Sequence, residues 1–383
     1  MADSSPGFKH AEISRQLRAE IASGRYGVDG RLPSEAVLVK RFDVSRPTIG
    51  QALRTLEQEG VIERRAGSGT YARTGGVPQD QAGQRLLALL IPDLGNTEIF
   101  QLICGEIASL ARVHGYSLIW GGSGQPRLDA DVSLRHAAEL CQHYLERRVS
   151  GVFFAPFELV PEKEAANRAM AVMLRDAGIQ VVLLDRDLVP FPGRSDFDTV
   201  GVDNIAAGYQ LAAHLLKLGC QTFRFVTRPH SAPTVSARIA GMRIALAGYG
   251  QEMPRPWICE GDPADPKFVR SLFVPECPDA ILCANDHTAA LLMRSLHQLK
   301  IAVPEKVRVV GLDDVKFATL VSPALTTVQQ PCREIAIAAF QAMRERLADP
   351  TLPARQITLA PRLIVRDSCG AYLQAGKGRR AGG

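Results

Sequence analysis

The 383-residue sequence lacks the signatures of several large protein classes. No apolar run approaches the ~18 residues that a membrane-spanning helix needs, and the first stretch of the chain holds no apolar signal-peptide segment. We therefore expect no membrane span and a cytoplasmic location. The motifs GxxxxGK[ST], GxSxG and HExxH are absent, and no GxGxxG follows a predicted strand. The residues therefore offer no support for an enzyme.

The cysteines are too scattered to indicate disulfides or a metal site. The sequence has eight of them, with no CxxC pair and no histidine at metal-ligand spacing. Such a pattern is typical of reduced thiols in a cytoplasmic protein. We therefore expect neither a metal ion nor another cofactor. The cysteines stand at positions 104, 141, 220, 259, 277, 283, 332 and 369.

Charge is unevenly distributed along the chain. Residues 1–75 hold 12 Lys and Arg against 9 Asp and Glu, a net charge of +3, whereas residues 85–370 are close to neutral. Lys377, Arg379 and Arg380 make the C-terminal end basic. A basic head on a near-neutral body suits a nucleic-acid contact that is confined to the head.

Residues 32–71 carry the most informative local pattern. Ser34, after a proline, is a good N-cap for a short helix, and Ser45 opens a second helix that runs to Glu59 before Gly60. Two helices joined by so short a turn have the helix-turn-helix shape, and a basic β-hairpin is predicted to follow them. The second helix has one apolar face, formed by Ile49, Ala52, Leu53 and Leu56.

The polar surface of this head predicts contact with DNA. Short hydroxyl side chains and an arginine stand at the N-terminus of the second helix, where such helices meet base edges and phosphates. The guanidinium of Arg46 suits both a guanine edge and a phosphate, whereas Ser45 has the alternative role of a helix cap alone. The expected DNA-binding residues are Ser34, Ser45, Arg46, Pro47, Thr48, Gln51, Arg64, Arg65, Gly67, Ser68 and Gly69.

The rest of the chain predicts a linker and an α/β body. Residues 10–23 complete the head as an amphipathic helix, and residues 74–84, rich in Gly, Pro and Gln, form the linker. From residue 85 continuous apolar strands alternate with helices, which predicts doubly wound parallel sheets covered on both faces. About 285 residues exceed one such sheet, so we expect two lobes with a cleft. Strands are predicted over 86–92, 117–122, 151–156, 181–185, 223–227, 280–284, 307–313, 325–328 and 357–365, and helices over 98–113, 129–147, 162–177, 204–218, 234–249, 286–300 and 332–348.

Residues 10–73 resemble the winged helix-turn-helix domain of the GntR family. The resemblance is carried by LPSE, LVKRFDVSRPTIGQALRTLEQEGVI and GSGTY, with cap, turn, helix and wing in register. The family commonly has an arginine where this chain has Gly50. The resemblance therefore implies a DNA-binding head that lacks one of the family's contacts, or one in which Gln51 supplies it.

Residues 85–370 resemble the ligand-binding domain of the LacI/GalR family, itself similar to periplasmic sugar-binding proteins. The resemblance is carried by IPDLGNTEIFQLICGEIA, GVFFAP, VVLLDRDL, VGVDNIAAG, SARIAGM, DAILCANDHTA, VRVVGLDD, SPALTTVQQP and PRLIVRDS, in this order. A GntR head on a LacI-type body is similar to arabinose-type repressors. It implies an α/β protein with a winged helix-turn-helix domain over 8–73, a linker over 74–84, a two-lobed, periplasmic-binding-protein-like domain of parallel sheets over 85–370 and a basic tail over 371–383.

Polar residues at the C-terminal ends of parallel strands are the expected ligand contacts, because open α/β folds leave their crevice there. The resemblance implies that Arg238 and Asp313 clamp ligand hydroxyls, and that Phe100 is an aromatic residue of the first lobe near the ligand. Strand-end capping or lobe packing is the alternative role for the weaker candidates. The expected ligand-binding residues are Phe100, Asp185, Arg238, Asn285, His287 and Asp313.

The resemblance implies a transcriptional regulator, most simply a repressor, whose operator binding is controlled by a small ligand. Purine-responsive relatives carry an arginine and an aromatic residue where this chain has Ala232 and Pro263, which favours a sugar or sugar derivative as the effector. We expect a homodimer on a palindromic double-stranded DNA operator. A ligand-independent architectural DNA-binding protein, a transport-type binding protein and an α/β enzyme are the competing interpretations.

Overall fold

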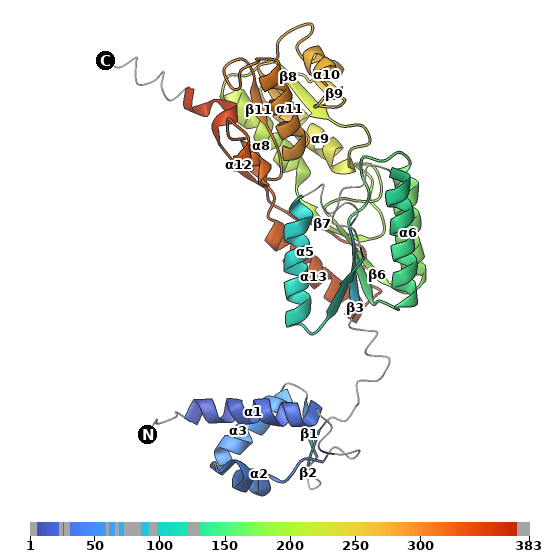
Figure 1. The fold of residues 1–383 in the computed structure, drawn as a ribbon, viewed down its shortest axis with the longest axis vertical. Helices are drawn as coiled ribbons and strands as arrows, with labels where there is room; N and C mark the ends of the chain where they lie inside the picture. The colour runs from blue at the N-terminus through green and yellow to red at the C-terminus, as the bar shows by residue number, and fades with distance from the viewer. Residues whose placement is uncertain are drawn as a thin grey trace, which may run out of the picture. The chain divides into compact units, whose positions relative to one another are not determined.

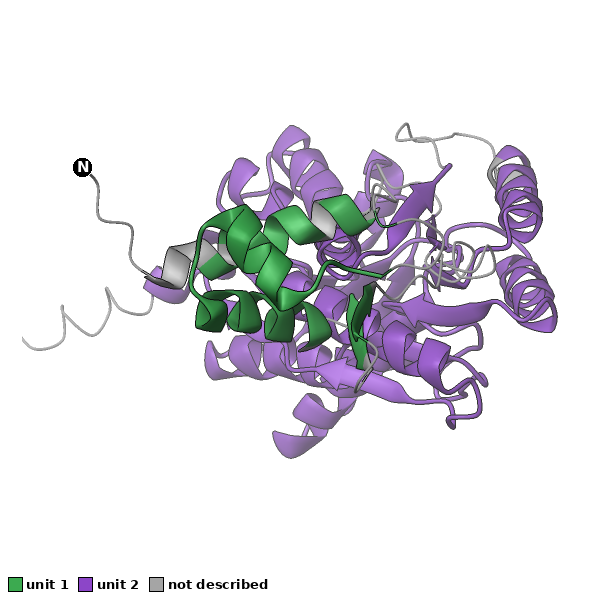
Figure 2. Cartoon of the chain, turned by 90° about the horizontal axis from the view of Figure 1, so that it is seen from below, with its two compact units in different colours: residues 1–82 green, residues 83–383 purple. Residues whose placement is uncertain are grey.

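The computed structural model of the chain contains two compact units, Met1–Ala82 and Gly83–Gly383 (Figure 1, Figure 2). The predicted linker at 74–84 lies outside the residues that the structure describes, and so does the tail beyond residue 373. The described residues are 6–22, 26, 31–58, 61–65, 69–72, 86–91, 98–121 and 130–373.

The first unit is a small helical domain with a hairpin. Its described residues form α1 (Pro6–Ala22), α2 (Glu35–Phe42), α3 (Arg46–Gln58) and the antiparallel strands β1 (Ile62–Arg65) and β2 (Gly69–Ala72). The apolar face predicted for the second helix is fully buried, and Ile13 and Leu17 of α1 complete the core around it. The predicted helix-turn-helix and its hairpin are therefore confirmed.

Two parallel sheets form the centres of the two lobes of the second unit. Its described strands are β3 (Leu86–Leu90), β4 (Ser117–Trp120), β5 (Gly151–Phe154), β6 (Gln180–Leu184), β7 (Asp198–Val202), β8 (Phe223–Thr227), β9 (Ile258–Glu260), β10 (Ala280–Cys283), β11 (Arg308–Val310), β12 (Thr327–Gln329), β13 (Gln356–Leu359) and β14 (Arg362–Ile364). The first-lobe sheet has the order β13-β7-β6-β5-β3-β4, and the second-lobe sheet has the order β11-β10-β8-β9. Every pairing in these two sheets is parallel, whereas β12 and β14 form an antiparallel pair of their own.

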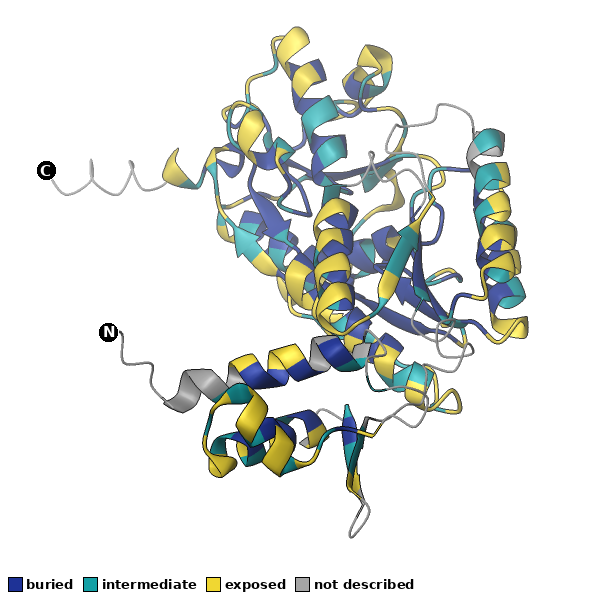
Figure 3. Ribbon diagram, turned by 60° about the horizontal axis from the view of Figure 1, so that its bottom comes forward, coloured by how far each residue is buried: buried dark blue, intermediate teal, exposed yellow. Residues whose placement is uncertain are grey.

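Helices cover both faces of each sheet, so that the central strands are buried between them, whereas the edge strands β4, β9 and β13 are partly exposed (Figure 3). The described helices are α5 (Glu98–Val113), α6 (Ala130–Glu146), α7 (Lys163–Asp176), α8 (Asn204–Lys217), α9 (Pro233–Gly248), α10 (Pro266–Ser271), α11 (Asp286–Gln298), α12 (Phe317–Leu320) and α13 (Cys332–Ala348), with short 3₁₀ turns at Arg255–Trp257 and Asp367–Cys369. In the first lobe α5 and α13 share one apolar core, while α6 and α7 share another. In the second lobe α8 and α9 lie in one core and α10 and α11 in the other. The predicted doubly wound arrangement is confirmed.

The chain crosses between the lobes from β7 to α8, from β12 to α13 and from β13 to β14. The prediction of one closing strand over 357–365 is wrong, because residues 360 and 361 carry the chain across. Strand β13 pairs with β7 in the first lobe, whereas β14 pairs with β12. Strand β7 was not predicted either, since its sequence DTVGV contains a charged residue, a threonine and a glycine rather than an apolar run.

Helices α8 and α9 of the second lobe touch through two glycines. A Cβ atom on Gly208 would lie 1.9 Å from the carbonyl oxygen of Arg238, and one on Gly241 would lie 2.0 Å from the carbonyl oxygen of Ile205. The two backbones are therefore in direct contact, which only glycine permits at both positions. This contact fixes the beginning of α8, just after a crossing, against the first half of α9.

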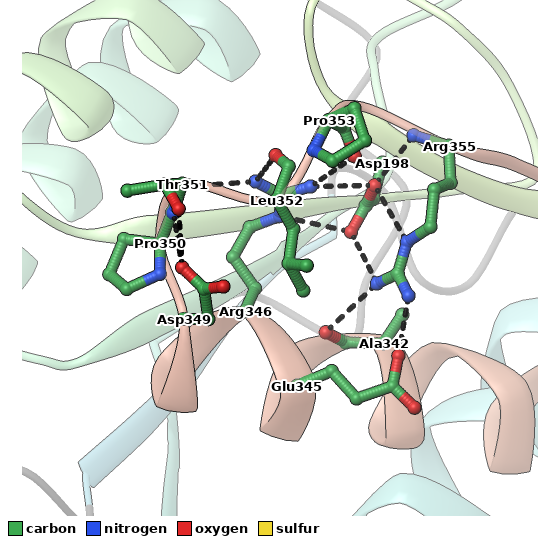
Figure 4. A network of polar contacts seen from close by, with 10 residues as sticks. All are labelled: Asp198, Ala342, Glu345, Arg346, Asp349, Pro350, Thr351, Leu352, Pro353 and Arg355. Carbon is green, nitrogen blue, oxygen red and sulfur yellow. Dashed lines mark hydrogen bonds and ion pairs between the residues drawn. The ribbon is translucent and has the colours of Figure 1, made fainter.

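An ion-pair network joins β7, β13 and α13 in the first lobe (Figure 4). The buried carboxylate of Asp198 accepts hydrogen bonds from Arg346 at 2.9 Å and 3.0 Å and from the guanidinium of Arg355 at 2.9 Å. Burial by itself raises the pKa of the Asp198 carboxyl, but the hydrogen bonds from both arginines outweigh burial and lower that pKa below its usual value. The network therefore holds the end of α13 and the beginning of β13 on β7.

Candidate DNA-binding and ligand-binding sites

The N-terminus of α3 presents the predicted DNA-binding residues on an exposed surface. Ser45 begins the helix through its carbonyl oxygen, which accepts from the N–H of Thr48 at 3.1 Å, while the two hydroxyl groups lie 2.8 Å apart. Arg46 and Pro47 are exposed beside them. Ser34, the residue before α2, is exposed and makes no capping hydrogen bond with its side chain. Ser34 and Ser45 therefore stand at the beginnings of the two helices of the motif.

Glu35 links helix α3 to the hairpin of β1 and β2, which forms the wing. Its carboxylate lies 3.5 Å from Nε of Arg46 and 3.4 Å from Nη2 of Arg64, and Arg64 also lies 3.6 Å from the carboxylate of Glu57. The Arg46 side chain is 78% exposed, so its contact with Glu35 is a weak surface pair that a phosphate can replace. The sequence interpretation missed Glu35, although the LPSE motif contains it.

The remaining predicted DNA-binding residues have different outcomes. Gln51 is exposed on α3 and accepts a hydrogen bond from Arg54 at 2.9 Å. A Cβ atom on Gly50 would meet nothing within 4 Å, so the glycine leaves open space beside Gln51. Gly69 begins β2 with a φ of 123°, which favours glycine. Gly67, Ser68 and the side chain of Arg65 lie outside the described residues.

Arg41 has a structural role in the described head. Its guanidinium pairs with Glu20 of α1 and lies 2.9 Å from Glu20 Oε2, and the hydroxyl of Tyr26 donates to the same oxygen at 2.5 Å. The hydrogen bond from Arg41 lowers the pKa of Glu20 to about 2, despite the opposing effect of burial. Arg41 therefore ties α2 to α1, and we leave it out of the candidate DNA contacts.

The two strongest candidate ligand residues, Arg238 and Asp313, are buried at the cleft between the lobes, and so is Asp185. Asp185 follows β6 and Asp313 follows β11, and both adopt a positive φ, of 68° and 126°. Arg238 in α9 donates from Nε to Asn204 at 2.8 Å and from Nη1 to the carbonyl oxygen of Ala284 at 2.5 Å. Strand ends from both lobes and a helix of the second lobe thus converge on one cluster.

The electrostatics of the cluster are set by burial. Burial raises the pKa of Asp185 and raises that of Asp313 well above the usual range, while the positive charge of Arg238 opposes both shifts. The side-chain amide of Gln330 donates to Asp313 at 2.8 Å. Among the described residues, Oδ1 of Asp185 and Oε1 of Gln330 are buried side-chain oxygens with no hydrogen-bond partner. Gln330 lies in the crossing before α13 and was missed, although it stands in the quoted SPALTTVQQP stretch.

Arg186 is the largest omission of the sequence interpretation. Its side chain is almost fully buried, with Nη1 2.7 Å from Glu158 and 3.6 Å from Asp185, and its Nε donates to the carbonyl oxygen of Pro156 at 2.6 Å. The guanidinium lies 5.4 Å from the centre of the Phe100 ring. Phe100 itself is fully buried in the core of the first lobe, so Arg186 covers the aromatic face that was expected to meet a ligand.

Asn285 and His287 have packing roles in the described structure. The side chain of Asn285 caps α11 by accepting from the N–H of Thr288 at 2.9 Å. The His287 ring lies 5.5 Å from the ring of Phe317, and burial, followed by the charge of Arg228, lowers its pKa. Capping was the alternative role for Asn285, whereas for His287 the alternative was a histidine on the helix surface.

A pocket opens at the end of this cluster where β6 and β7 meet the first turns of α8 and α9. It begins at Asp185 and Arg186 and extends toward the edge strand β13, so it lies at the carboxyl ends of parallel strands. Its polar lining includes Asp187, Arg194, Asn204, Thr234 and Gln356. The pocket therefore adds space and further polar groups to the same interlobe site.

Two groups of contacts join the lobes beside the site. The ammonium group of Lys163 in α7 donates to the carbonyl oxygens of His230 and of Ser231, the latter at 2.6 Å. On another side, Glu98 in α5 accepts from the N–H of Lys316 at 3.1 Å and from its ammonium group at 2.5 Å. These contacts span the two lobes, so they contribute to setting the separation of the lobes.

The described residues contain no group of three His, Cys, Asp or Glu side chains that could hold a metal ion. None of the helices among them is long and apolar enough to cross a membrane.

Two family profiles match the chain. Residues 9–72 match the bacterial regulatory proteins of the gntR family, and residues 212–369 match the periplasmic binding protein-like domain. The resemblance drawn from the sequence is therefore confirmed for both parts. The chain joins a GntR-type helix-turn-helix domain to a periplasmic-binding-protein-like domain.

Curated relatives and solved structures match the chain over different shares of its length. The chain is 23% identical over 370 residues to the arabinose metabolism transcriptional repressor of Geobacillus stearothermophilus, covering 94% of this chain and 97% of the relative. It is 28% identical over 229 residues to the ribose operon repressor of Escherichia coli, covering 58% and 66% of the two chains. A solved complex of the transcriptional regulator CelR with cellobiose has a TM-score of 0.62 at 22% identity and covers 85% of this chain and 91% of the other. A LacI family regulator from Enterococcus faecium with bound ribose has a TM-score of 0.58 at 21% identity, covering 74% and 98%. The second unit thus has the fold of LacI-type effector domains.

Proposed function

We propose that this chain is a transcriptional repressor whose binding to a DNA operator is controlled by a sugar or sugar derivative in the interlobe cleft. One observation carries the proposal: a basic helix-turn-helix head shares the chain with a buried polar cluster at strand ends that retains unpartnered oxygens. The nearly full-length similarity to an arabinose metabolism repressor supports the same combination of roles.

In the head, Arg46 and Arg64 are the proposed DNA contacts, with the hydroxyl groups of Ser45 and Thr48 as phosphate donors. Glu35 holds the two arginines close to one another, which suits a helix in the major groove and a wing beside it. Gly50, in the first half of α3, has no side chain with which to contact a base. Phosphate contacts therefore supply a larger part of the DNA affinity than they would if an arginine stood at this position.

In the body, Asp185, Arg238 and Asp313 are the proposed ligand contacts, with Gln330 joining them from the crossing. A ligand that bridges the two lobes favours the closed cleft, and this preference is the free energy that couples ligand to DNA. We propose that closure acts on the heads of a homodimer through the segment 74–84, and so changes their fit to a palindromic operator. This role implies a cytoplasmic location and requires no catalysis.

DNA captured by the purified chain from fragmented genomic DNA of its own source tests the first half of the proposal. We expect enriched fragments that share an inverted repeat, and loss of the enrichment when residues 1–75 are deleted. The deleted chain should still be stabilised by the same sugars as the full chain in a thermal-shift screen. Enrichment without any stabilising sugar would favour the ligand-independent architectural role instead.

A further inference from the structure

The buried cluster of the interlobe cleft contains no surplus of positive charge. Its carboxylates are Asp185, Glu158 and Asp313, and its guanidinium groups are Arg186 and Arg238. The nearby ammonium group of Lys163 is held by two backbone carbonyl oxygens rather than directed at the cluster. With its three carboxyl groups ionised and Lys163 counted, this set carries equal positive and negative charge, and the buried carboxyl of Asp286 adjoins Asp313 as a further acidic group. An anion entering the ionised set would meet no net attraction.

Both guanidinium groups are already engaged. Arg186 is bound by Glu158 and the carbonyl oxygen of Pro156 and lies over an aromatic ring. Arg238 is bound by Asn204 and the carbonyl oxygen of Ala284. A bidentate grip on a phosphate or carboxylate needs two parallel N–H donors of one guanidinium. The contacts above use the single Nε–H of each arginine and one N–H of each Nη1, so the Nε edge of neither guanidinium is free for such a grip.

The groups that lack partners are acceptors. Oδ1 of Asp185 and Oε1 of Gln330 are buried oxygens without a hydrogen-bond donor, which is an unfavourable state for a polar atom. Asp185 also lines the pocket that extends from the cluster, so this residue stands at the boundary between the pocket and the buried cluster. A hydroxyl group is suited to the position, because it donates to such an oxygen and accepts from an N–H that remains on an arginine.

We propose, on the basis of the proposed function, that the effector is an uncharged polyhydroxy compound and that the cleft excludes phosphorylated and carboxylated sugars. Two hydroxyl groups of such a ligand would donate to Asp185 and Gln330. A phosphate would instead add negative charge beside carboxylates whose pKa values burial already raises, and it would bring no donor to the two oxygens.

Thermal shift of the full chain with matched pairs of compounds tests this proposal. The neutral members are L-arabinose, D-ribose and D-glucose. Their anionic counterparts are L-arabinonate for arabinose, D-ribose 5-phosphate for ribose, and D-glucose 6-phosphate and D-glucuronate for glucose. We expect stabilisation by at least one neutral member and by no anionic member. Stabilisation by an anionic member alone would overturn this inference and leave the proposed function standing, whereas no stabilisation by either set would overturn both.

A variant pair tests the assigned acceptor. Asp185→Asn replaces one oxygen with a donor that opposes the ligand hydroxyl, so the affinity for the stabilising sugar should fall by about tenfold or more. Asp196→Asn in the same loop is the matched control, because the Asp196 side chain is 88% exposed. The sugar affinity of this variant should equal that of the unaltered chain. Unchanged affinity of a folded Asp185→Asn variant would overturn the assignment, and the paired comparison of compounds decides the ligand class without any variant.

Discussion

Asp198 offers the sharpest test of what holds the first lobe together. In Asp198→Asn the side chain keeps its size but loses its charge, and its new NH₂ group faces donors of Arg346 and Arg355. Removing one member of a buried ion pair typically costs 3–5 kcal/mol, because the remaining charge is left uncompensated. Arg346 is 11% exposed and Arg355 30% exposed, so water partly solvates the arginines and we expect the lower end, about 3 kcal/mol.

Urea unfolding followed by tryptophan fluorescence measures this loss. Trp120 on β4 reports the first lobe, and Trp257, whose ring lies 5.6 Å from that of Phe223, reports the second. The urea concentration at the midpoint of unfolding should fall, with little change in the slope of the unfolding free energy against urea concentration. The Asp196→Asn control should stay within about 0.5 kcal/mol of the unaltered chain.

The stability that Asp198→Asn removes depends on pH in a way that follows from the sign of the pKa shift of Asp198. The folded-state pKa of Asp198 lies below the usual value, so its contribution is fully present above the unfolded pKa of about 3.9 and disappears as the pH falls through the folded-state pKa. The loss should be constant between about pH 5 and pH 8 and shrink only under more acidic conditions. A loss below about 1 kcal/mol at pH 7, or one that varies between pH 5 and pH 8, would refute the reasoning.

Three further predictions concern the head and the cleft. Leu53→Ala empties a fully buried position of the head and should cost about 3 kcal/mol, abolishing operator binding in a gel-shift assay but leaving sugar-induced thermal shifts intact; loss of both would contradict the separation of the units. Arg46→Ala should weaken operator binding and reduce the slope of log affinity against log salt by about one, whereas Arg15→Ala, an exposed arginine of α1, should change neither quantity. Lys163→Met removes the ammonium group that joins the lobes, so calorimetry should show sugar affinity falling by about tenfold; equal affinity would mean that this contact does not favour the closed cleft.

Much of the fold follows from local patterns in the sequence. The helix over 98–113 and the helix over 332–348 coincide with their predicted bounds, because long periodic segments are flanked by clear breaks. Strand β7 escaped notice because its two buried valines, Val200 and Val202, are separated by a glycine and preceded by Asp198, so they form no apolar run. Asp198 is itself buried because arginines distant in the sequence pair with it. The break at residues 360 and 361 was missed for a related reason, because β13 and β14 read as one continuous strand in the sequence although they belong to different sheets.

The candidate site was only partly accessible to sequence reasoning. Asp185, Arg238 and Asp313 were predicted from strand ends and from a family motif, and the structure brings them into one cluster. Arg186 and Glu158 were missed because their pairing joins residues 28 positions apart, and no local pattern announces such a pair. Phe100 was expected to face a ligand, yet a charged neighbour covers its ring, which only the three-dimensional packing reveals.

The helix contact at Gly208 and Gly241 limits how this protein can be re-engineered as a biosensor. Because the two helices touch backbone to backbone, any larger residue at either glycine would push apart Asn204 and Arg238, which form one hydrogen bond across the helix pair. A mutational library aimed at a new effector therefore has to spare both glycines. It can vary the pocket lining at Thr234, Arg194 and Gln356, with Arg194 and Gln356 changed together because they share a hydrogen bond.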